Sequence, residues 1–254
     1  MADTALIGLD WGTSSLRAFR FGADGAILER RRADRGILKV EAGRFAEALD
    51  DAVGDWRTAA PKAPILMAGM IGSRQGWVEA PYASCPADAA SLAGALAPIP
   101  DVAGAAIVPG VAWRHGTAAP EVMRGEETQI IGLGGIKARL VILPGTHSKW
   151  VWVDDKGSIA RFTTFMTGEV FDVLKRYSIL GRLMPAPDGP ADPAALATGF
   201  ARGLDDALAP DGPGTLQSLF AARARGLFNE LASEALPGYL SGLLIGAELK
   251  EGCH

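Results

Sequence analysis

One order of strands and loops occurs twice in this chain, about half a chain apart, and the repeat restricts the folds that the sequence can adopt. The first copy begins with a β-branched and apolar run at residues 4–10, which predicts a buried strand. A small polar loop at 11–15 follows, and residues 16–30 read as two strands joined by a turn at Asp24-Gly25. This copy therefore places a loop rich in glycine and hydroxyl groups at the end of a strand.

The second copy covers residues 140–162. The apolar run at 140–143 predicts another buried strand, and the loop at 144–148 again contains Gly-Thr and a serine. Residues 149–162 again read as two strands around a turn. We interpret the pair as a duplication, which predicts an α/β protein with two related domains. Two such loops on facing strands can hold opposite sides of one polyphosphate in a cleft between the domains.

The first loop carries the groups that a phosphate site needs. Asp10 at the mouth of the strand can bind Mg²⁺ through water. Gly12 allows the backbone to approach a phosphate oxygen, and Thr13 and Ser14 supply hydroxyl and amide donors. Arg17 can reach a transferring phosphoryl group as a fixed cation. An ordinary Gly-Thr-Ser turn is an equally good interpretation of the loop taken alone.

The second loop, Gly145 to Lys149, has the same small residues but no acid. Thr146 and Ser148 supply hydroxyl groups, and Lys149 can pair with a phosphate as a point charge. His147 has two interpretations of similar weight, because it could contact phosphate or hold the loop through side-chain hydrogen bonds.

Two acids open the predicted helix that precedes the second copy. Glu126 and Glu127 follow Gly125, where carboxylates complement the helix dipole. The alternative is that one of them accepts the proton of an attacking hydroxyl group. The residues alone favour neither role.

A glycine-rich segment at 69–77 follows another predicted strand. Its Ser73, Arg74 and Gln75 can grip a carboxylate and hydroxyl groups, with the arginine binding in two-pronged fashion. Trp77 and Tyr82 would form the walls of such a site. The competing interpretation is a surface loop with a structural tryptophan.

The rest of the chain alternates helices and strands. Apolar spacing predicts a helix at 44–56 that buries Phe45, Leu49, Val53 and Trp56. Strands are predicted at 65–68 and 105–108, and helices at 89–96, 169–176, 192–208, 216–234 and 238–250. Gly242 and Gly246 predict a close helix crossing, which we expect against the 125–132 helix. Glycines from Gly132 to Gly135 suggest a hinge, which gives domains at 1–132 and 133–254.

Composition excludes several classes of protein. The 254 residues carry a formal charge of −4 with a pI near 5.5, which argues against nucleic-acid binding. No apolar stretch is long enough to span a membrane, and no signal peptide is recognisable at the N-terminus. Cys85 and Cys253 have neither disulfide-framework nor zinc spacing, which favours a reducing cytoplasm.

Segments along nearly the whole chain resemble the 2-dehydro-3-deoxygalactonokinase family, within the larger actin–hexokinase fold group. They are LDWGTSSLR at 9–17, AGMIGSRQGWVEAPY at 68–82, CPA at 85–87, RGEETQIIG at 124–132, LPGTHSKWV at 143–151, TFMTGEVF at 164–171, SILG at 178–181 and YLSGLLIGAEL at 239–249. The first segment indicates only the fold group, whereas the second, fourth, fifth and last are specific to the family.

The resemblance implies two duplicated actin/hexokinase-like (ribonuclease H-like) domains and ATP-dependent phosphorylation of the 6-hydroxyl group of 2-dehydro-3-deoxy-D-galactonate. ATP and Mg²⁺ are the implied cofactors, with Asp10 organising the metal. Residues 12–14 match the first phosphate loop and residues 145–149 the second. Glu126 takes the place of the general base, and Glu127 remains an alternative because a one-residue slip exchanges them.

Family members continue beyond the last matching segment into a strand and a helix, so we expect the second domain to lack these here. The expected partner is a small sugar acid, with no nucleic acid and no membrane; the oligomeric state is open, a homodimer being one arrangement. Two rival functions are kept. One is a phosphohydrolase of the same fold, similar to an exopolyphosphatase, and the other is a nucleotide-binding protein without catalysis.

Overall fold

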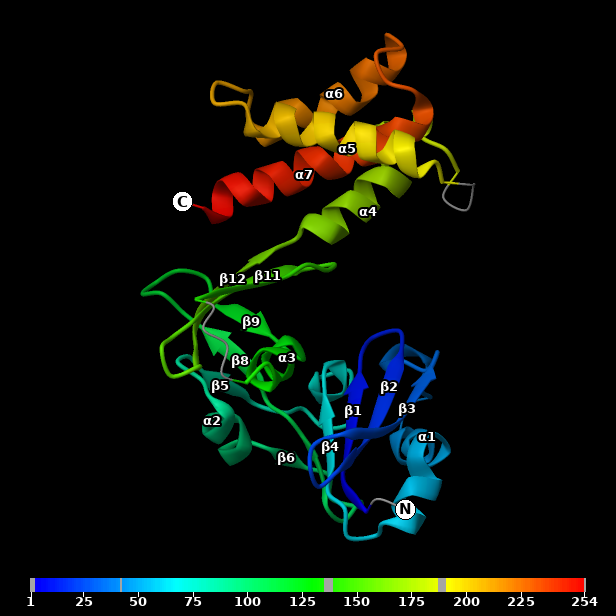
Figure 1. Ribbon diagram of the computed structural model, residues 1–254, viewed down its shortest axis with the longest axis vertical. Helices are drawn as coiled ribbons and strands as arrows, with labels where there is room; N and C mark the ends of the chain where they lie inside the picture. The colour runs from blue at the N-terminus through cyan, green and yellow to red at the C-terminus, as the bar shows by residue number, and fades with distance from the viewer. Residues whose placement is uncertain (1–2, 42, 135–138, 187–190, 254) are drawn as a thin grey trace. The chain divides into compact units, whose positions relative to one another are not determined.

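The chain forms a mixed α/β protein, seen in a computed structural model that describes residues 3–41, 43–134, 139–186 and 191–253 (Figure 1). Within these residues it divides into two compact units. Unit 1 comprises Met1–Val141 and Val151–Phe162, and unit 2 comprises Ile142–Trp150 and Thr163–His254. The domain boundary at 132/133 stays a prediction, and Gly135 of the expected hinge lies outside the described residues.

Unit 1 contains a six-stranded sheet in the order β3-β2-β1-β4-β7-β6. Its strands are β1 Thr4–Trp11, β2 Leu16–Gly22, β3 Ile27–Ala33, β4 Ile65–Ala68, β6 Ala97–Pro98 and β7 Ala105–Ile107. β1 pairs antiparallel with β2 and parallel with β4. Because parallel strands end at the same edge of a sheet, the segments that follow β1 and β4 are neighbours.

Helix α1, Phe45–Ala59, forms as the apolar spacing predicts. Phe45, Leu49, Val53 and Trp56 are all buried, and they join the core made by the inner face of the sheet. The remaining faces of this helix carry charged residues, so its position follows from burial of one stripe.

A smaller sheet in the order β5-β8-β9 completes the strands of the first part of unit 1. These strands are β5 Tyr82–Ser84, β8 Gly110–Trp113 and β9 Glu121–Met123. Two short helices accompany them, α2 Ala89–Gly94 and α3 Glu126–Gly132.

The second copy of the repeat also forms its three strands, in a sheet of order β10-β11-β12. The strands are β10 Leu140–Leu143, β11 Ser148–Val153 and β12 Ile159–Phe165. The expected burial of the first strand is wrong, because Leu140 and Ile142 are 37% and 40% exposed. In contrast to β1, which has neighbours on both sides, β10 lies at the edge of its sheet.

Unit 2 is mainly helical, with α4 Thr167–Tyr177, α5 Pro193–Leu208, α6 Thr215–Leu227 and α7 Leu236–Gly252. The prediction that one helix runs from 216 to 234 is wrong at its end. Asn229 adopts a left-handed backbone angle (φ 55°), which ends a right-handed helix. A short 3₁₀ turn at Ser233–Ala235 then leads into α7.

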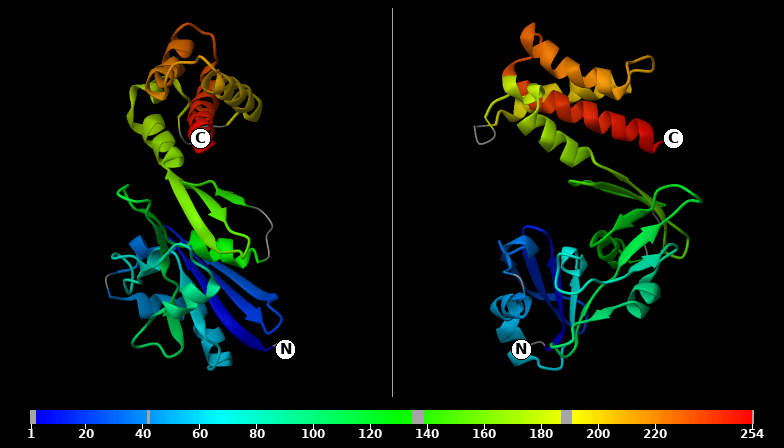
Figure 2. Two further views of the ribbon diagram at one scale, coloured as in Figure 1. Left: turned by 90° about the vertical axis from the view of Figure 1, so that its left-hand side faces the viewer. Right: turned by 180° about the vertical axis from the view of Figure 1, so that it is seen from behind.

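Helices α5 and α7 lie side by side and approach closely through glycines (Figure 2). A Cβ atom on Gly203 of α5 would lie 2.2 Å from the Tyr239 carbonyl oxygen of α7, and one on Gly242 would lie 2.2 Å from the Phe200 carbonyl oxygen. The expected close crossing at Gly242 therefore occurs, but its partner is α5 rather than the 125–132 helix. A side chain at either position would force the two backbones apart.

Among the residues that the structure describes, no helix has the length and apolar character needed to cross a membrane. Both cysteines are free thiols. Burial raises the pKa of the Cys85 thiol to about 11, so this side chain is protonated at neutral pH.

We predict that Gly203→Ala lowers the free energy of unfolding by about 1–3 kcal/mol, because the new methyl group cannot fit against the α7 backbone. Urea unfolding followed by circular dichroism measures the change. Gly214→Ala is the matched control, since a Cβ atom there meets no heavy atom within 4 Å. Equal stability of the two variants would contradict the proposed close packing.

Candidate functional site

The first loop connects β1 to β2 as a tight turn. The Gly12 amide donates a hydrogen bond to the Ser15 carbonyl at 3.0 Å, and Thr13 and Ser14 are exposed. Asp10 and Arg17 are cross-strand partners at the base of the loop, and their side chains form an ion pair. The structure thus brings together all the residues that the sequence predicts for the first phosphate loop.

The segment after β3 forms backbone hydrogen bonds with this loop. The Ile37 amide donates to the Gly12 carbonyl at 3.0 Å, and the Leu38 amide donates to the Thr13 carbonyl at 3.3 Å. The Trp11 indole donates to the Arg35 carbonyl at 2.9 Å. The first loop is therefore held through its own backbone, which leaves its hydroxyl groups free to face a ligand.

Gly69, directly after β4, joins the first loop to the start of α3. A Cβ atom on Gly69 would lie 3.0 Å from the Trp11 carbonyl oxygen and 3.5 Å from the Asp10 carboxylate. One on Gly125 would lie 3.2 Å from the Gly69 Cα atom. Both glycines have positive φ angles, 95° and 112°, which other residues adopt only with strain. The carboxylate of Asp10 and the first turn of α3 therefore converge on one glycine.

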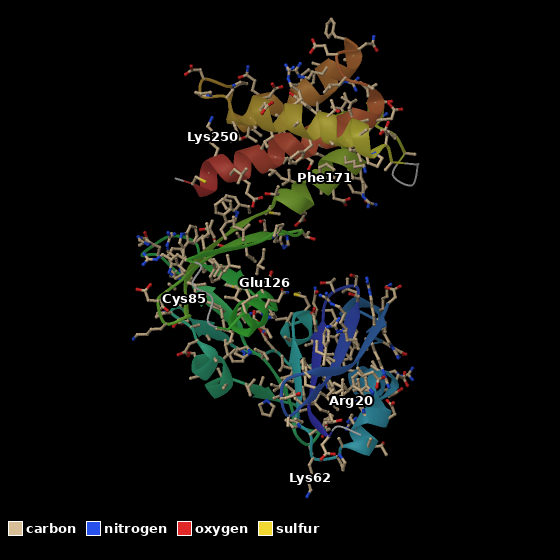
Figure 3. All side chains as sticks on the ribbon, in the orientation of Figure 1. Arg20, Lys62, Cys85, Glu126, Phe171 and Lys250 are labelled. Carbon is tan, nitrogen blue, oxygen red and sulfur yellow. The ribbon has the colours of Figure 1, made fainter. Side chains whose placement is uncertain are left out.

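The two acids of α3 have different surroundings, and Figure 3 labels the first of them. Glu126 is half-buried, and its carboxylate accepts a hydrogen bond from the Arg124 amide at 3.1 Å. Glu127 is completely buried and accepts from the Gly125 amide at 2.6 Å and the Thr128 hydroxyl at 3.0 Å. Burial raises the pKa of Glu127 to about 7, against the opposing effect of these hydrogen bonds.

Arg124 is a half-buried cation that sequence reasoning did not single out as a site residue. Its Nη2 donates to the Ala80 carbonyl at 2.8 Å, and its guanidinium group covers the Tyr82 ring at 4.4 Å. Its Nε and Nη1 atoms are buried and have no hydrogen-bond partner among the described residues. The sequence signals for this arginine are its place just before Gly125 and its position at the start of the segment at 124–132.

The predicted substrate segment divides between two roles. Ser73 donates to the Met70 carbonyl at 2.7 Å, and Gln75 is exposed. Arg74 is 87% exposed and donates from its Nε atom to Glu79 at 3.0 Å. Trp77 is half-buried, stacks on Phe45 at 6.1 Å and packs against the core of unit 1. The polar residues of this segment remain accessible, whereas the tryptophan contributes to packing.

The second loop lies in unit 2, between β10 and β11. Gly145, Thr146 and His147 are exposed, whereas Ser148 and Lys149 are buried. The Lys149 ammonium group donates to the Thr164 hydroxyl at 2.9 Å. Hence the exposed part of the loop, rather than its lysine, forms the surface that a ligand would meet first.

His147 is held by an acid from α4. Its Nε2 atom lies 2.5 Å from a carboxylate oxygen of Glu169, and both side chains are about half exposed. Of the two interpretations left open for this histidine, the structure contains the side-chain hydrogen bond that the second one requires. Contact with phosphate stays a prediction.

A cavity of about 270 Å³ borders the second loop within unit 2. Its walls are mainly apolar, with Phe171 of α4, labelled in Figure 3, on one side and Leu244 of α7 on another. Glu248 supplies a carboxylate in this wall and accepts hydrogen bonds from the Ser148 hydroxyl and the Trp150 indole, both at 2.7 Å. Its mainly apolar walls can accept an apolar or aromatic part of a ligand beside the loop.

The donor set of the first loop can be compared with the needs of Mg²⁺. In the described part of the chain, no group of three or more His, Cys, Asp or Glu residues could hold a metal ion. Asp10 offers one partly exposed carboxylate, already paired with Arg17. Mg²⁺ is commonly bound by one or two carboxylates together with phosphate and water, so this single acid fits a metal that arrives with its phosphate ligand.

The family model described as 2-keto-3-deoxy-galactonokinase matches residues 10–254. A protein of Rhizobium meliloti (strain 1021) named probable 2-dehydro-3-deoxygalactonokinase DgoK1 is 44% identical over 185 residues, which are 71% of this chain and 59% of that protein. The 2-dehydro-3-deoxygalactonokinase of Escherichia coli (strain K12) is 38% identical over 244 residues, 96% of this chain and 78% of that protein.

A solved structure agrees with these matches. A crystal structure of a Sinorhizobium meliloti protein, whose description carries the name 2-dehydro-3-deoxygalactonokinase, superposes with a TM-score of 0.84 at 38% sequence identity. It covers 98% of this chain and 81% of that one. The resemblance read from the sequence segments is therefore confirmed, and the chain belongs to the 2-keto-3-deoxy-galactonokinase family.

Proposed function

We propose that this protein transfers the γ-phosphoryl group of ATP to the 6-hydroxyl group of 2-dehydro-3-deoxy-D-galactonate, on a fold of two actin/hexokinase-like halves. Membership of the family and the names of its relatives support the reaction class. One observation carries the assignment of the site. In unit 1 the Asp10 carboxylate and the first turn of α3 meet at Gly69, which brings a metal-organising acid and a candidate base into one region.

The phosphates of ATP are held in this proposal by the two loops, residues 12–14 and 145–149. Arg17 balances charge on the transferring group. Asp10 would hold Mg²⁺ through water, and the metal would neutralise phosphate charge when bound. The cavity beside the second loop would receive part of the adenosine, because its apolar walls suit a flat base and Glu248 can accept from a hydroxyl group.

The sugar acid binds, in this proposal, at the segment that follows β4. Ser73, Arg74 and Gln75 are accessible polar groups, and the guanidinium group of Arg74 can exchange Glu79 for a substrate carboxylate. Tyr82 is 45% exposed and can form a wall. Trp77 supports the site indirectly, because its ring packs on Phe45 beneath the segment.

Glu126 is the better candidate for the general base. A base must reach the hydroxyl proton that it accepts, and Glu126 is only half-buried, with one protein donor described. Glu127 has no exposed surface, and both of its carboxylate oxygens accept hydrogen bonds from neighbouring residues. We therefore propose that Glu126 takes the proton as the 6-oxygen forms its bond to phosphorus and the bond to ADP breaks, while Glu127 fixes the turn.

A coupled assay for ADP release tests the reaction on a panel of 2-dehydro-3-deoxy sugar acids. We expect turnover to depend on the sugar acid and to be fastest with the galactonate-derived compound. A phosphohydrolase would instead release ADP from ATP at the same rate with and without sugar acid, and a binding protein would release none.

The cytoplasm, where ATP and thiols coexist, is the compartment that we propose.

We predict that Glu126→Gln lowers kcat by about 10²–10⁴-fold and leaves the Kd for MgATP within about twofold, because the amide cannot accept the proton. Single-turnover kinetics and calorimetry measure the two quantities. Full activity of this variant would exclude Glu126 as the base.

We predict that wild-type stability falls as pH rises from about 4.5 to 7, and then levels off. The folded protein keeps a proton on Glu127 in this range, where the unfolded chain releases it, so folding is favoured at the lower pH by roughly 3 kcal/mol at most. Glu127→Gln should remove this loss and retain phosphoryl transfer. Urea unfolding at pH 5 and pH 8 makes the comparison, and identical pH dependence of the two proteins would count against it.

A further inference from the structure

The two copies of the predicted repeat share a further feature, because in each a glycine after the third strand packs against the loop. In unit 1, a Cβ atom on Gly36 would lie 2.2 Å from the Thr13 carbonyl oxygen and 2.3 Å from the Ser14 amide nitrogen. In unit 2, one on Gly168 would lie 2.3 Å from the Gly145 carbonyl oxygen. The backbone of each loop therefore packs directly against a glycine, Gly36 or Gly168, and a Cβ atom at that glycine would clash with the loop.

The supporting segment in unit 2 forms a backbone hydrogen bond to its loop, as Leu38 does in unit 1, and adds side-chain contacts. The Glu169 amide donates to the Thr146 carbonyl at 2.9 Å, while the Glu169 carboxylate lies 2.5 Å from His147 Nε2. At the other end of the segment, the Thr164 hydroxyl accepts from Lys149 at 2.9 Å. Three residues of the loop, Thr146, His147 and Lys149, are thus bonded to residues 164–169.

The loop and its support differ only partly in exposure. Residues 144–147 are exposed, whereas Thr164, Gly168 and Glu169 are half-buried. The His147 and Glu169 side chains are about equally exposed, and Gly168 also lines the cavity beside the loop, so the support acts on the loop through the contacts above and also borders the space that a ligand would enter.

We infer that residues 164–169, here named the brace, are a positioning segment that sets the second loop for the phosphates of the nucleotide. The identity of that ligand rests on the proposed function. A loop that is already ordered loses less conformational entropy when the nucleotide binds. The brace therefore raises nucleotide affinity without contacting the sugar acid. Within the brace, Glu169 orients His147, and Gly168 allows the loop backbone to pack closely against the brace.

The role of Glu169 is tested by a double-mutant cycle with His147, using MgADP binding to the full chain by calorimetry. We expect Glu169→Gln to weaken MgADP by about tenfold in the wild-type background. In the His147→Ala background the same change should have less than about a twofold effect, because the side chain that it orients is gone. The KM for the sugar acid should stay within about twofold. Additive effects of the two changes would overturn the orienting role.

Asp172→Asn is the matched control. It also converts an acid of α4 to an amide, but Asp172 pairs with Arg176 and not with the loop. MgADP affinity should therefore be unchanged in this variant.

Amide hydrogen exchange on the ligand-free chain tests the brace independently of the nucleotide. We expect faster exchange at residues 145–149 in both Glu169→Gln and Gly168→Ala, with exchange of α5 and α7 unchanged. Glu169→Gln removes no backbone contact, so it serves even if Gly168→Ala does not fold. Wild-type exchange in the Glu169→Gln loop would overturn the brace. Absence of MgADP binding by the wild-type chain would overturn the proposed function instead, while the exchange data still decide the brace.

Discussion

Close approach of backbone to backbone at a few glycines is the constraint on which the site depends. Gly69 allows the end of β4 to contact both the first loop and the turn before α3. Gly36 and Gly168 allow a returning segment to lie under each loop. A single methyl group at any of these positions would sit closer to a neighbouring atom than ordinary packing permits. The positions of the acids and hydroxyl groups of the site therefore depend on these three glycines.

The local pattern of the sequence predicted the strands and α1 well, because each follows from a periodicity that nearby residues complete. The repeat at 4–30 and 140–162 formed both sets of strands, and Phe45, Leu49, Val53 and Trp56 are buried as predicted. Burial of β10 was predicted wrongly. An apolar run does not reveal whether its strand will have neighbours on both sides, and β10 is an edge strand.

The candidate site was less predictable, since its decisive contacts join residues that are distant in sequence. Trp77 was predicted as a wall of the substrate site, and its ring packs on Phe45, a contact that no local sequence pattern indicates. The second loop contains no acid of its own, but the carboxylate of Glu169, on the next helix, contacts His147. No local pattern indicates the contacts of Arg124 and Glu248, and only the fold shows what surrounds them.

The contact of Glu248 with the second loop has a consequence for the order of events during synthesis. The backbone hydrogen-bond partners described for the first loop all lie within a short stretch of chain that ends at Leu38. Ser148 and Trp150, by contrast, bond to a carboxylate that is 100 and 98 residues further along the chain. Contacts between residues that are far apart in sequence form late, and they lower the rate of folding. The backbone contacts of the first loop can therefore form early on the nascent chain, whereas those of the second loop with Glu248 must wait for α7 to be translated and to dock.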